Sequence, residues 1–201
     1  MKRHLHISVA AAIASFSFVS ASADDFGYCL VCHGADGNGN AAIHAPKISG
    51  LEPWYIARQL EAFASGARGV AAEDAPGHEM GPIGMRLKKE DQIEAAVQFV
   101  GSLKSHVPTA TVSADVDKGR ELYGTCAGCH GMTGEGMPDL KAPALAARTD
   151  WYLVTQLNNF RQGLRGTDAA DIYGSQMRAV ASTLPDDKAI TDVVAYINTL
   201  K

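Results

Sequence analysis

Two short runs of the chain place two cysteines and a histidine in the same close spacing. Residues 29–33 read Cys-Leu-Val-Cys-His, and residues 126–130 read Cys-Ala-Gly-Cys-His. Cysteines three apart on a helix lie on one face, so each sulfur can bond one vinyl group of a porphyrin while the next residue offers an imidazole to the iron. This spacing predicts two covalently bound c-type haems. The predicted thioether residues are Cys29, Cys32, Cys126 and Cys129, and the predicted iron-ligating imidazoles are those of His33 and His130.

Three other uses of paired cysteines explain the pattern less well. Zinc-binding pairs usually stand about 15–20 residues apart, which is far closer than these two. A thioredoxin-like redox pair needs a βαβ setting, and the sequence shows none. Structural disulfides are common in exported proteins, but they would not account for a histidine after both pairs.

The two motifs belong to a longer internal repeat. A shift of 97 residues aligns residues 27–104 with 124–201 without a gap and gives 26 identities in 78 pairs. Both tryptophans and all four cysteines are among the identical positions. Self-similarity on this scale indicates a tandem duplication.

Methionine is the expected second iron ligand, because a His/Met pair raises the potential of a haem that transfers electrons. Met80 and Met177 occupy equivalent repeat positions and stand equally far beyond their histidines. We expect them to ligate the iron from loops that face the haem. Filling gaps in a core is the ordinary role of methionine, and Met85, Met132 and Met137 have no methionine partner in the other half.

Other repeated residues suggest supporting roles. A turn carbonyl at Pro46 or Pro143 could accept the N–H of the ligand histidine and hold its tautomer. Arg68 and Arg165 could pair with haem propionates, or could equally be solvated charges at helix ends. The histidines that are not repeated are predicted to lie at the surface, although His78 is also a rival ligand; they are His44, His78 and His106.

The apolar pattern of each half predicts helices. Apolar positions recur near a 3.6-residue period over 54–63 and again over 151–160, with Pro53 at a start and Gly66 at an end. A second amphipathic helix closes each half, over about 93–103 and 190–200, after acidic residues that suit a helix N-terminus. The fold class is therefore all-α.

The N-terminus carries the three-part pattern of an export signal. Lys2 and Arg3 precede an apolar stretch that ends near Val19, and residues 21–23 read Ala-Ser-Ala. An uncleaved anchor is the alternative, but the stretch is shorter than the roughly 20 apolar residues that span a bilayer. The predicted organisation is a signal peptide over 1–23, a domain over 24–104, a Ser/Thr/Pro-containing linker over 105–116 and a domain over 117–201.

Composition narrows the classes of partner. The chain has 201 residues, 18 basic against 22 acidic, and a formal net charge of −4. Nucleic acids and anionic membranes select Lys/Arg-rich surfaces, so neither is expected as a partner. We expect an exported, periplasmic protein without a transmembrane segment after cleavage.

The chain resembles the dihaem cytochrome c4 family in its two Cys-x-x-Cys-His motifs, each followed by a Gly-x-x-Gly-x-Gly loop, an Ala-Pro, a Tyr-x-x-x-Gln-Leu helix, a Gly-x-Arg and a later Met. The resemblance covers about residues 26–201. It implies two class I cytochrome c folds facing each other about a pseudo-twofold axis. It also implies periplasmic electron shuttling, often from a quinol-oxidising complex to a terminal oxidase.

The leading hypothesis is therefore an electron carrier with two haem c groups and no catalytic residues. A second hypothesis is an electron-transfer subunit bound to a periplasmic dehydrogenase. A third is a dihaem enzyme such as a peroxidase, which would need an open iron position, or a thiosulfate dehydrogenase, which would use a cysteine ligand that this chain has already committed to thioethers.

Overall fold

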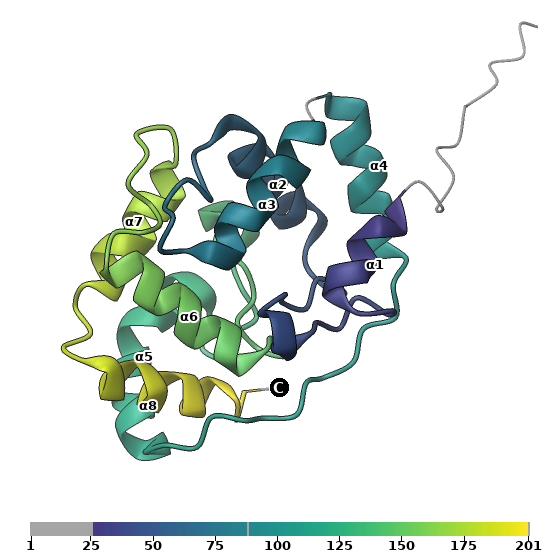
Figure 1. Cartoon of the computed structure of the whole chain (residues 1–201). Helices are drawn as coiled ribbons and strands as arrows, with labels where there is room; N and C mark the ends of the chain where they lie inside the picture. The colour runs from purple at the N-terminus through teal and green to yellow at the C-terminus, as the bar shows by residue number, and fades with distance from the viewer. Residues whose placement is uncertain (1–25, 88, 201) are drawn as a thin grey trace, which may run out of the picture.

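The computed structural model describes residues 26–87 and 89–200 as helices joined by loops (Figure 1). The predicted export signal over 1–23 lies outside the described residues. Within the described part of the chain no strand is formed, and β pairing is limited to isolated bridges between Asn40 and Ala45 and between Met137 and Ala142. The all-α prediction is confirmed.

Each half builds the same succession of elements. The first half contains α1 (Tyr28–His33), η2 (Ala41–Ile43), α2 (Pro53–Ser65), α3 (Ala75–Arg86) and α4 (Glu90–Gly101). The second half contains α5 (Val116–His130), η3 (Pro138–Leu140), α6 (Asp150–Arg161), α7 (Ile172–Ala181) and α8 (Asp187–Ile197). Figure 1 shows α2, α3 and α4 in its upper part, α5 and α8 in its lower part, and α6 between them.

Helix α2 begins and ends at the residues that its sequence predicts. Pro53 is its first residue, where a missing N–H costs nothing, and Gly66 ends it in the left-handed conformation at φ 80°. Its counterpart α6 follows Thr149, whose side chain makes no capping hydrogen bond. Asp150 is already inside α6, and its carboxylate serves the linker instead.

Helices α3 and α7 differ from the sequence-based expectation, which placed Met80 and Met177 in loops. Both methionines lie inside helices. Each helix starts with an aspartate whose carboxylate accepts from a glycine N–H three residues on, at 3.2 Å for Asp74 and 2.8 Å for Asp171. Pro82 within α3 obscured the helical pattern, because proline normally interrupts a helix.

The second half has the larger apolar core. Helix α8 packs on α5 through Ile190, Val193 and Val194, which are completely or almost completely buried, against Tyr123 and Ala127. Because α5 has 15 residues, it covers α8 along most of its length.

The first half has a smaller buried apolar cluster than the second. Helix α1 has only six residues, and the buried cluster beside it consists of Phe26, Leu87, Ile93 and Ala96. A domain of this size buries a limited core by itself, so a large apolar cofactor would contribute much of the missing contact.

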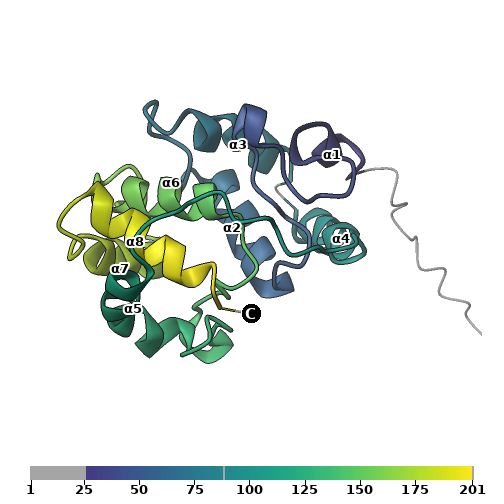
Figure 2. The same cartoon turned by 90° about the horizontal axis from the view of Figure 1, so that it is seen from below.

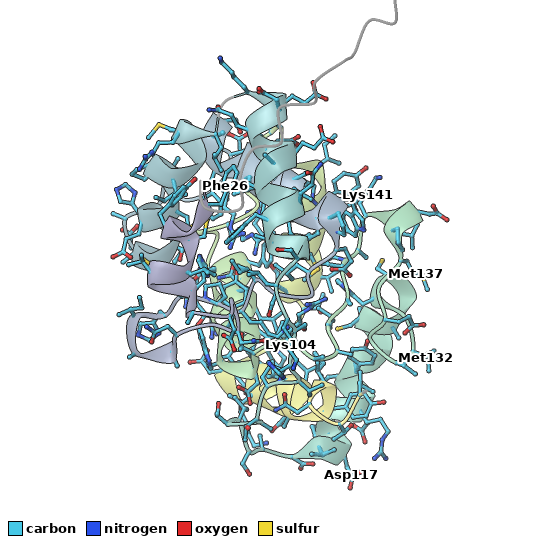
Figure 3. All side chains as sticks on the ribbon, turned by 90° about the vertical axis from the view of Figure 1, so that its right-hand side faces the viewer. Phe26, Lys104, Asp117, Met132, Met137 and Lys141 are labelled. Atoms are coloured by element: carbon cyan, nitrogen blue, oxygen red, sulfur yellow. The ribbon has the colours of Figure 1, made fainter. Side chains whose placement is uncertain are left out.

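The segment between α4 and α5 is an extended connection across the surface, as its composition predicts (Figures 1 and 2). Side chains hold its first residues: the Asn38 amide donates to the carbonyl oxygen of Lys104, and the Lys47 ammonium donates to the Ser105 hydroxyl at 2.7 Å. Lys104, labelled in Figure 3, is where the chain leaves the first half.

Asp150 fastens the other end of this connection to the second half. Its carboxylate accepts from the backbone N–H groups of Thr111, at 2.5 Å, and Val112, at 2.7 Å, and from the Asn198 amide at 3.0 Å. Asp150 is 2% exposed, so these donors have few alternative partners. One carboxylate thus joins the linker, the start of α6 and the end of α8.

We predict that Asp150→Ala lowers the free energy of unfolding of the holoprotein by about 3 kcal/mol, because each donor left without an acceptor costs about 1–3 kcal/mol. Guanidinium chloride titration followed by far-UV circular dichroism measures this loss of stability.

Burial alone would raise the pKa of Asp150, but the hydrogen bonds from Val112 and Thr111 lower it overall. The deficit should therefore be complete at neutral pH and shrink as the pH falls through the lowered folded-state pKa.

The matched control is Asp117→Ala. Its carboxylate pairs with Arg120 on the exposed surface of α5, so stability should stay unchanged within error. Equal stabilities of the Asp150 variant and the unmodified protein would contradict the assigned role.

Candidate haem sites

One cavity of about 670 Å³ runs between the two halves. Both Cys-x-x-Cys-His motifs open into it, and so do α3 and α7. The structure thus brings all eight predicted site residues to one cavity: Cys29, Cys32, His33, Met80, Cys126, Cys129, His130 and Met177. Most of the remaining lining is aliphatic or aromatic, as a site for a large apolar cofactor requires.

The two histidines are held in the same way. His33 Nδ1 lies 2.7 Å from the carbonyl oxygen of Pro46, and His130 Nδ1 lies 2.7 Å from that of Pro143. The carbonyl can only accept, so Nδ1 carries the proton and Nε2 keeps its lone pair. Burial lowers the pKa of both imidazoles, which keeps them neutral. A neutral imidazole with a free Nε2 is the form that binds a metal.

The cysteines of each pair differ in exposure. Cys29 and Cys126 are half-buried, whereas Cys32 and Cys129 are exposed at the rim. Burial raises the pKa of the Cys126 thiol to about 11 and raises that of Cys29 as well. No disulfide joins any two of these four cysteines, so no sulfur is committed to another cysteine and each could form a thioether bond.

Met80 and Met177 are the methionines that line the cavity. Met85 and Met132 are 49% and 74% exposed, and Met132 and Met137 lie along one edge of the molecule in Figure 3. The repeat position therefore distinguishes the cavity-lining methionines from the others.

The non-repeated histidines are exposed, as predicted. His78 does not line the cavity, and its Nδ1 lies 3.2 Å from the carbonyl oxygen of Gly69. His44 contributes to the rim and contacts the edge of Trp151. His106 lies at the start of the linker, with its backbone N–H bonded to Asn38.

Arg68 and Arg165 are not solvated helix-end charges, because each is only 7% exposed. Arg68 donates to Gln59 of its own half, at 2.7 Å, and to Tyr152 of the other half, at 2.7 Å. Arg165 donates to Gln156 of its own half, at 2.6 Å, and to Gln59, at 2.7 Å. Each guanidinium thus bonds to both halves.

Helical periodicity does not predict this reciprocal network, because periodicity alone places polar residues on a solvated face. The signal that could have revealed it is identity between the halves: Tyr55, Gln59 and Arg68 match Tyr152, Gln156 and Arg165. They are polar because they meet their own repeat copies across the interface, and Figure 2 shows α2 and α6 adjacent there.

The Nε atoms of Arg68 and Arg165 are buried and have no acceptor among the described residues. A buried donor without an acceptor costs about 1–3 kcal/mol, and an anionic group in the cavity beside these two arginines would satisfy both donors. An apolar macrocycle that carries carboxylates meets both conditions. The residues present therefore fit haem.

The comparisons with known proteins agree with this geometry. The family model described as cytochrome c matches residues 25–104 and 116–201. Cytochrome c4 of Azotobacter vinelandii is 31% identical over 183 residues, covering 86% of this chain and 84% of that protein. The thiosulfate dehydrogenase electron acceptor of Stutzerimonas stutzeri is 31% identical over 173 residues, covering 76% of this chain and 72% of that protein.

Solved structures are similar as well. Reduced cytochrome c4 from Pseudomonas stutzeri superposes with a TM-score of 0.70 at 27% identity, covering 89% of this chain and 96% of that one. A thiosulfate dehydrogenase from Marichromatium purpuratum gives a TM-score of 0.69 at 32% identity, covering 86% of this chain. The match takes up only 36% of that longer chain.

Two tandem cytochrome c domains with a Cys-x-x-Cys-His motif in each bind two haem c groups, and such a protein carries electrons. Among the helices of the described residues, none has the length and apolar character to cross a membrane. The repeated architecture, the paired motifs and the full-length similarity agree: the chain belongs to the cytochrome c family and, within it, to the dihaem cytochrome c4 family.

Proposed function

We propose that this dihaem electron carrier holds one haem in each half through its own Cys-x-x-Cys-His motif and one methionine, and that it catalyses no reaction at the iron. The observation that carries the proposal is the repeated placement of His33 with Met80, and of His130 with Met177, along one apolar cavity. The axial ligands are these two histidines and two methionines.

Each residue type has a separate task. The S–H of Cys29, Cys32, Cys126 and Cys129 adds across a vinyl group, with sulfur bonding to carbon and the hydrogen passing to the neighbouring carbon. The bound group supplies a one-electron iron couple. His33 and His130 offer Nε2 to the metal, while Pro46 and Pro143 hold the proton on Nδ1.

The apolar lining has an energetic consequence. Excluding water from the cavity favours the less charged, reduced state of the iron, and the methionine thioether acts in the same direction. With His33, Met80, His130 and Met177 holding the two irons, no coordination site would be left for a substrate. Electrons would then enter and leave where Cys32 and Cys129 are exposed to a redox partner.

The buried arginines support transfer between the two sites. Arg68 and Arg165 each bond across the interface and each keep one Nε donor for an anion. We assign them to the haem propionates. They would hold the two haems at a constant separation, because neither guanidinium can move without breaking bonds to both halves.

The N-terminal pattern supports export to the periplasm, with a signal peptide over 1–23. The proposed partners are redox proteins, with a quinol-oxidising complex or a dehydrogenase as donor and a terminal oxidase or similar protein as acceptor.

A second candidate is dedicated service to one dehydrogenase. Its support is the similarity to two proteins named thiosulfate dehydrogenase electron acceptor and to a thiosulfate dehydrogenase structure. Under this reading the protein should copurify with a tightly bound partner, whereas a free carrier should purify alone.

We predict that Met80→Ala and Met177→Ala each remove about half of the sulfur-to-iron charge-transfer absorption of the oxidised protein, because each deletes one of two thioether ligands. Visible absorption spectroscopy measures it. Met85→Ala is the control, since Met85 does not line the cavity, and should leave the band intact. A full-strength band in either ligand variant would contradict the assignment.

We predict two haems per chain and no rapid carbon monoxide binding by the reduced, unmodified protein. Pyridine haemochrome analysis against protein concentration measures the first, and stopped-flow mixing with carbon monoxide measures the second. The Met80 and Met177 variants serve as positive controls, because each opens one iron position. Rapid binding by the unmodified protein would favour a dihaem enzyme.

A further inference from the structure

One peptide group connects a carboxylate of the first half to the iron-binding histidine of the second. The peptide between Pro143 and Ala144 accepts from His130 Nδ1 at its carbonyl oxygen, 2.7 Å away. The N–H of the same peptide donates to the Glu52 carboxylate, and the distance from Ala144 N to Glu52 Oε1 is 2.6 Å. The order of groups is therefore carboxylate, peptide, imidazole.

Glu52 is directed toward this peptide rather than toward its own helix. It occupies the N-cap position of α2, yet its side chain makes no capping bond there. Its second oxygen lies 3.3 Å from Arg148 of the other half, and the two side chains are only 23% and 12% exposed. Arg148 also donates to the carbonyl oxygen of Gly50, at 2.8 Å, which keeps the pair in place.

A carboxylate in this position changes the properties of the imidazole. Negative charge at the N–H end of a peptide polarises it, so the carbonyl becomes a stronger acceptor for His130 Nδ1–H. The stronger bond makes Nε2 a better electron donor and stabilises the oxidised metal.

The first half lacks this arrangement. The equivalent peptide joins Pro46 to Lys47, and the repeat position of Glu52 is taken by Thr149. Within the described residues no carboxylate accepts from the Lys47 N–H. The Lys47 side chain instead brings a buried ammonium, which donates to the carbonyl oxygen of Ser49 and to the Ser105 hydroxyl. A nearby cation favours the reduced metal, so the two sites differ in the sign of the charge beside this peptide.

We propose that Glu52 is a positioning residue for His130 across the interface, and that its carboxylate stabilises the oxidised state of the haem of the second half. The inference rests on the ligation by His130 proposed above. The positive charge of Arg148 offsets part of the negative charge of Glu52. The remaining negative charge acts on His130 through the peptide that Glu52 contacts.

The test is Glu52→Gln in the haem-loaded protein, because glutamine keeps the shape and removes the charge. We expect the reduction equilibrium of the second-half haem to shift roughly tenfold toward the reduced state, which is about 59 mV for one electron. Spectroelectrochemical titration gives the potentials, and haem-methyl NMR signals assign each one to its haem. The first-half potential should move less.

A second readout reports on the hydrogen bond itself. In the reduced, diamagnetic protein, the Nδ1–H proton resonance of His130 should move upfield in Glu52→Gln as the bond to Pro143 weakens. The corresponding resonance of His33 should not move. A shift in potential without this change would mean that Glu52 acts only as a distant charge, and would overturn the positioning role.

Two variants serve as controls. Glu61→Gln makes the same change in charge at an exposed position of α2 and should leave both potentials in place. Arg148→Gln breaks the same ion pair but leaves Glu52 on the peptide, so the second-half potential should fall. If the pair were merely structural, Glu52→Gln and Arg148→Gln would move this potential in the same direction. The Arg148 variant also tests the proposal should Glu52→Gln fail to fold.

The outcomes separate this inference from the proposed function. Two haems per chain, an intact charge-transfer band and unchanged potentials in Glu52→Gln would overturn the role of Glu52 while leaving the ligand assignment standing. Absence of the second haem, or of its band, from the unmodified protein would overturn the ligand assignment itself.

Discussion

The hydrogen bond from each histidine to a proline carbonyl 13 residues later is the constraint on which both sites depend. It fixes which nitrogen carries the proton, and so which nitrogen faces the cavity. It also requires the intervening loop to fold tightly back on itself. At Gly39 a Cβ atom would lie 2.9 Å from the backbone nitrogen of Lys47, and at Gly136 it would lie 2.5 Å from that of Ala144. Only glycine permits this approach, and both glycines have positive φ.

The interface between the halves is the second level of organisation. Buried arginines rarely occur without partners, and here the partners come from the other repeat copy. The same side chains therefore hold the halves together and face the shared cavity. A duplication explains why one set of residues has both roles, because a helix surface that packs against its own repeat copy provides both sides of the interface. The network also accounts for arginine at these positions, since a guanidinium can donate in several directions at once.

The two halves differ in several residues that surround the two candidate haem sites. Asp150, which fastens the linker, stands where the first half has Pro53, and Lys47 stands where the second half has Ala144. Glu52 and Arg148 form an ion pair that has no repeat counterpart. The iron-ligand positions themselves are identical. Two sites with the same ligands can thus acquire different electrostatic surroundings, which a carrier of two electrons can use to order their transfer.

Much of the fold and most of the candidate site followed from local patterns. Cysteine spacing and apolar periodicity depend on neighbouring residues, and the 97-residue repeat follows from aligning the sequence with itself. The helices α2, α4, α6 and α8 and the eight residues that line the cavity could therefore be predicted. The role of Pro46 and Pro143 could be anticipated too, because a ligand histidine needs a partner for its second nitrogen. The helical setting of Met80 and Met177 was missed, since Pro82 and the glycines of α3 weaken the helical signal.

The sequence by itself determined that the chain is a duplicated, helical protein with two haem motifs, because repetition and covalent chemistry can be recognised residue by residue. Only the tertiary structure decided that Arg68 and Arg165 are buried between the halves and that Glu52 reaches the peptide beside His130. These contacts join residues 84 to 106 positions apart. Neither propensity nor spacing carries information over such separations, and it is the packing of one half on the other that brings the groups together.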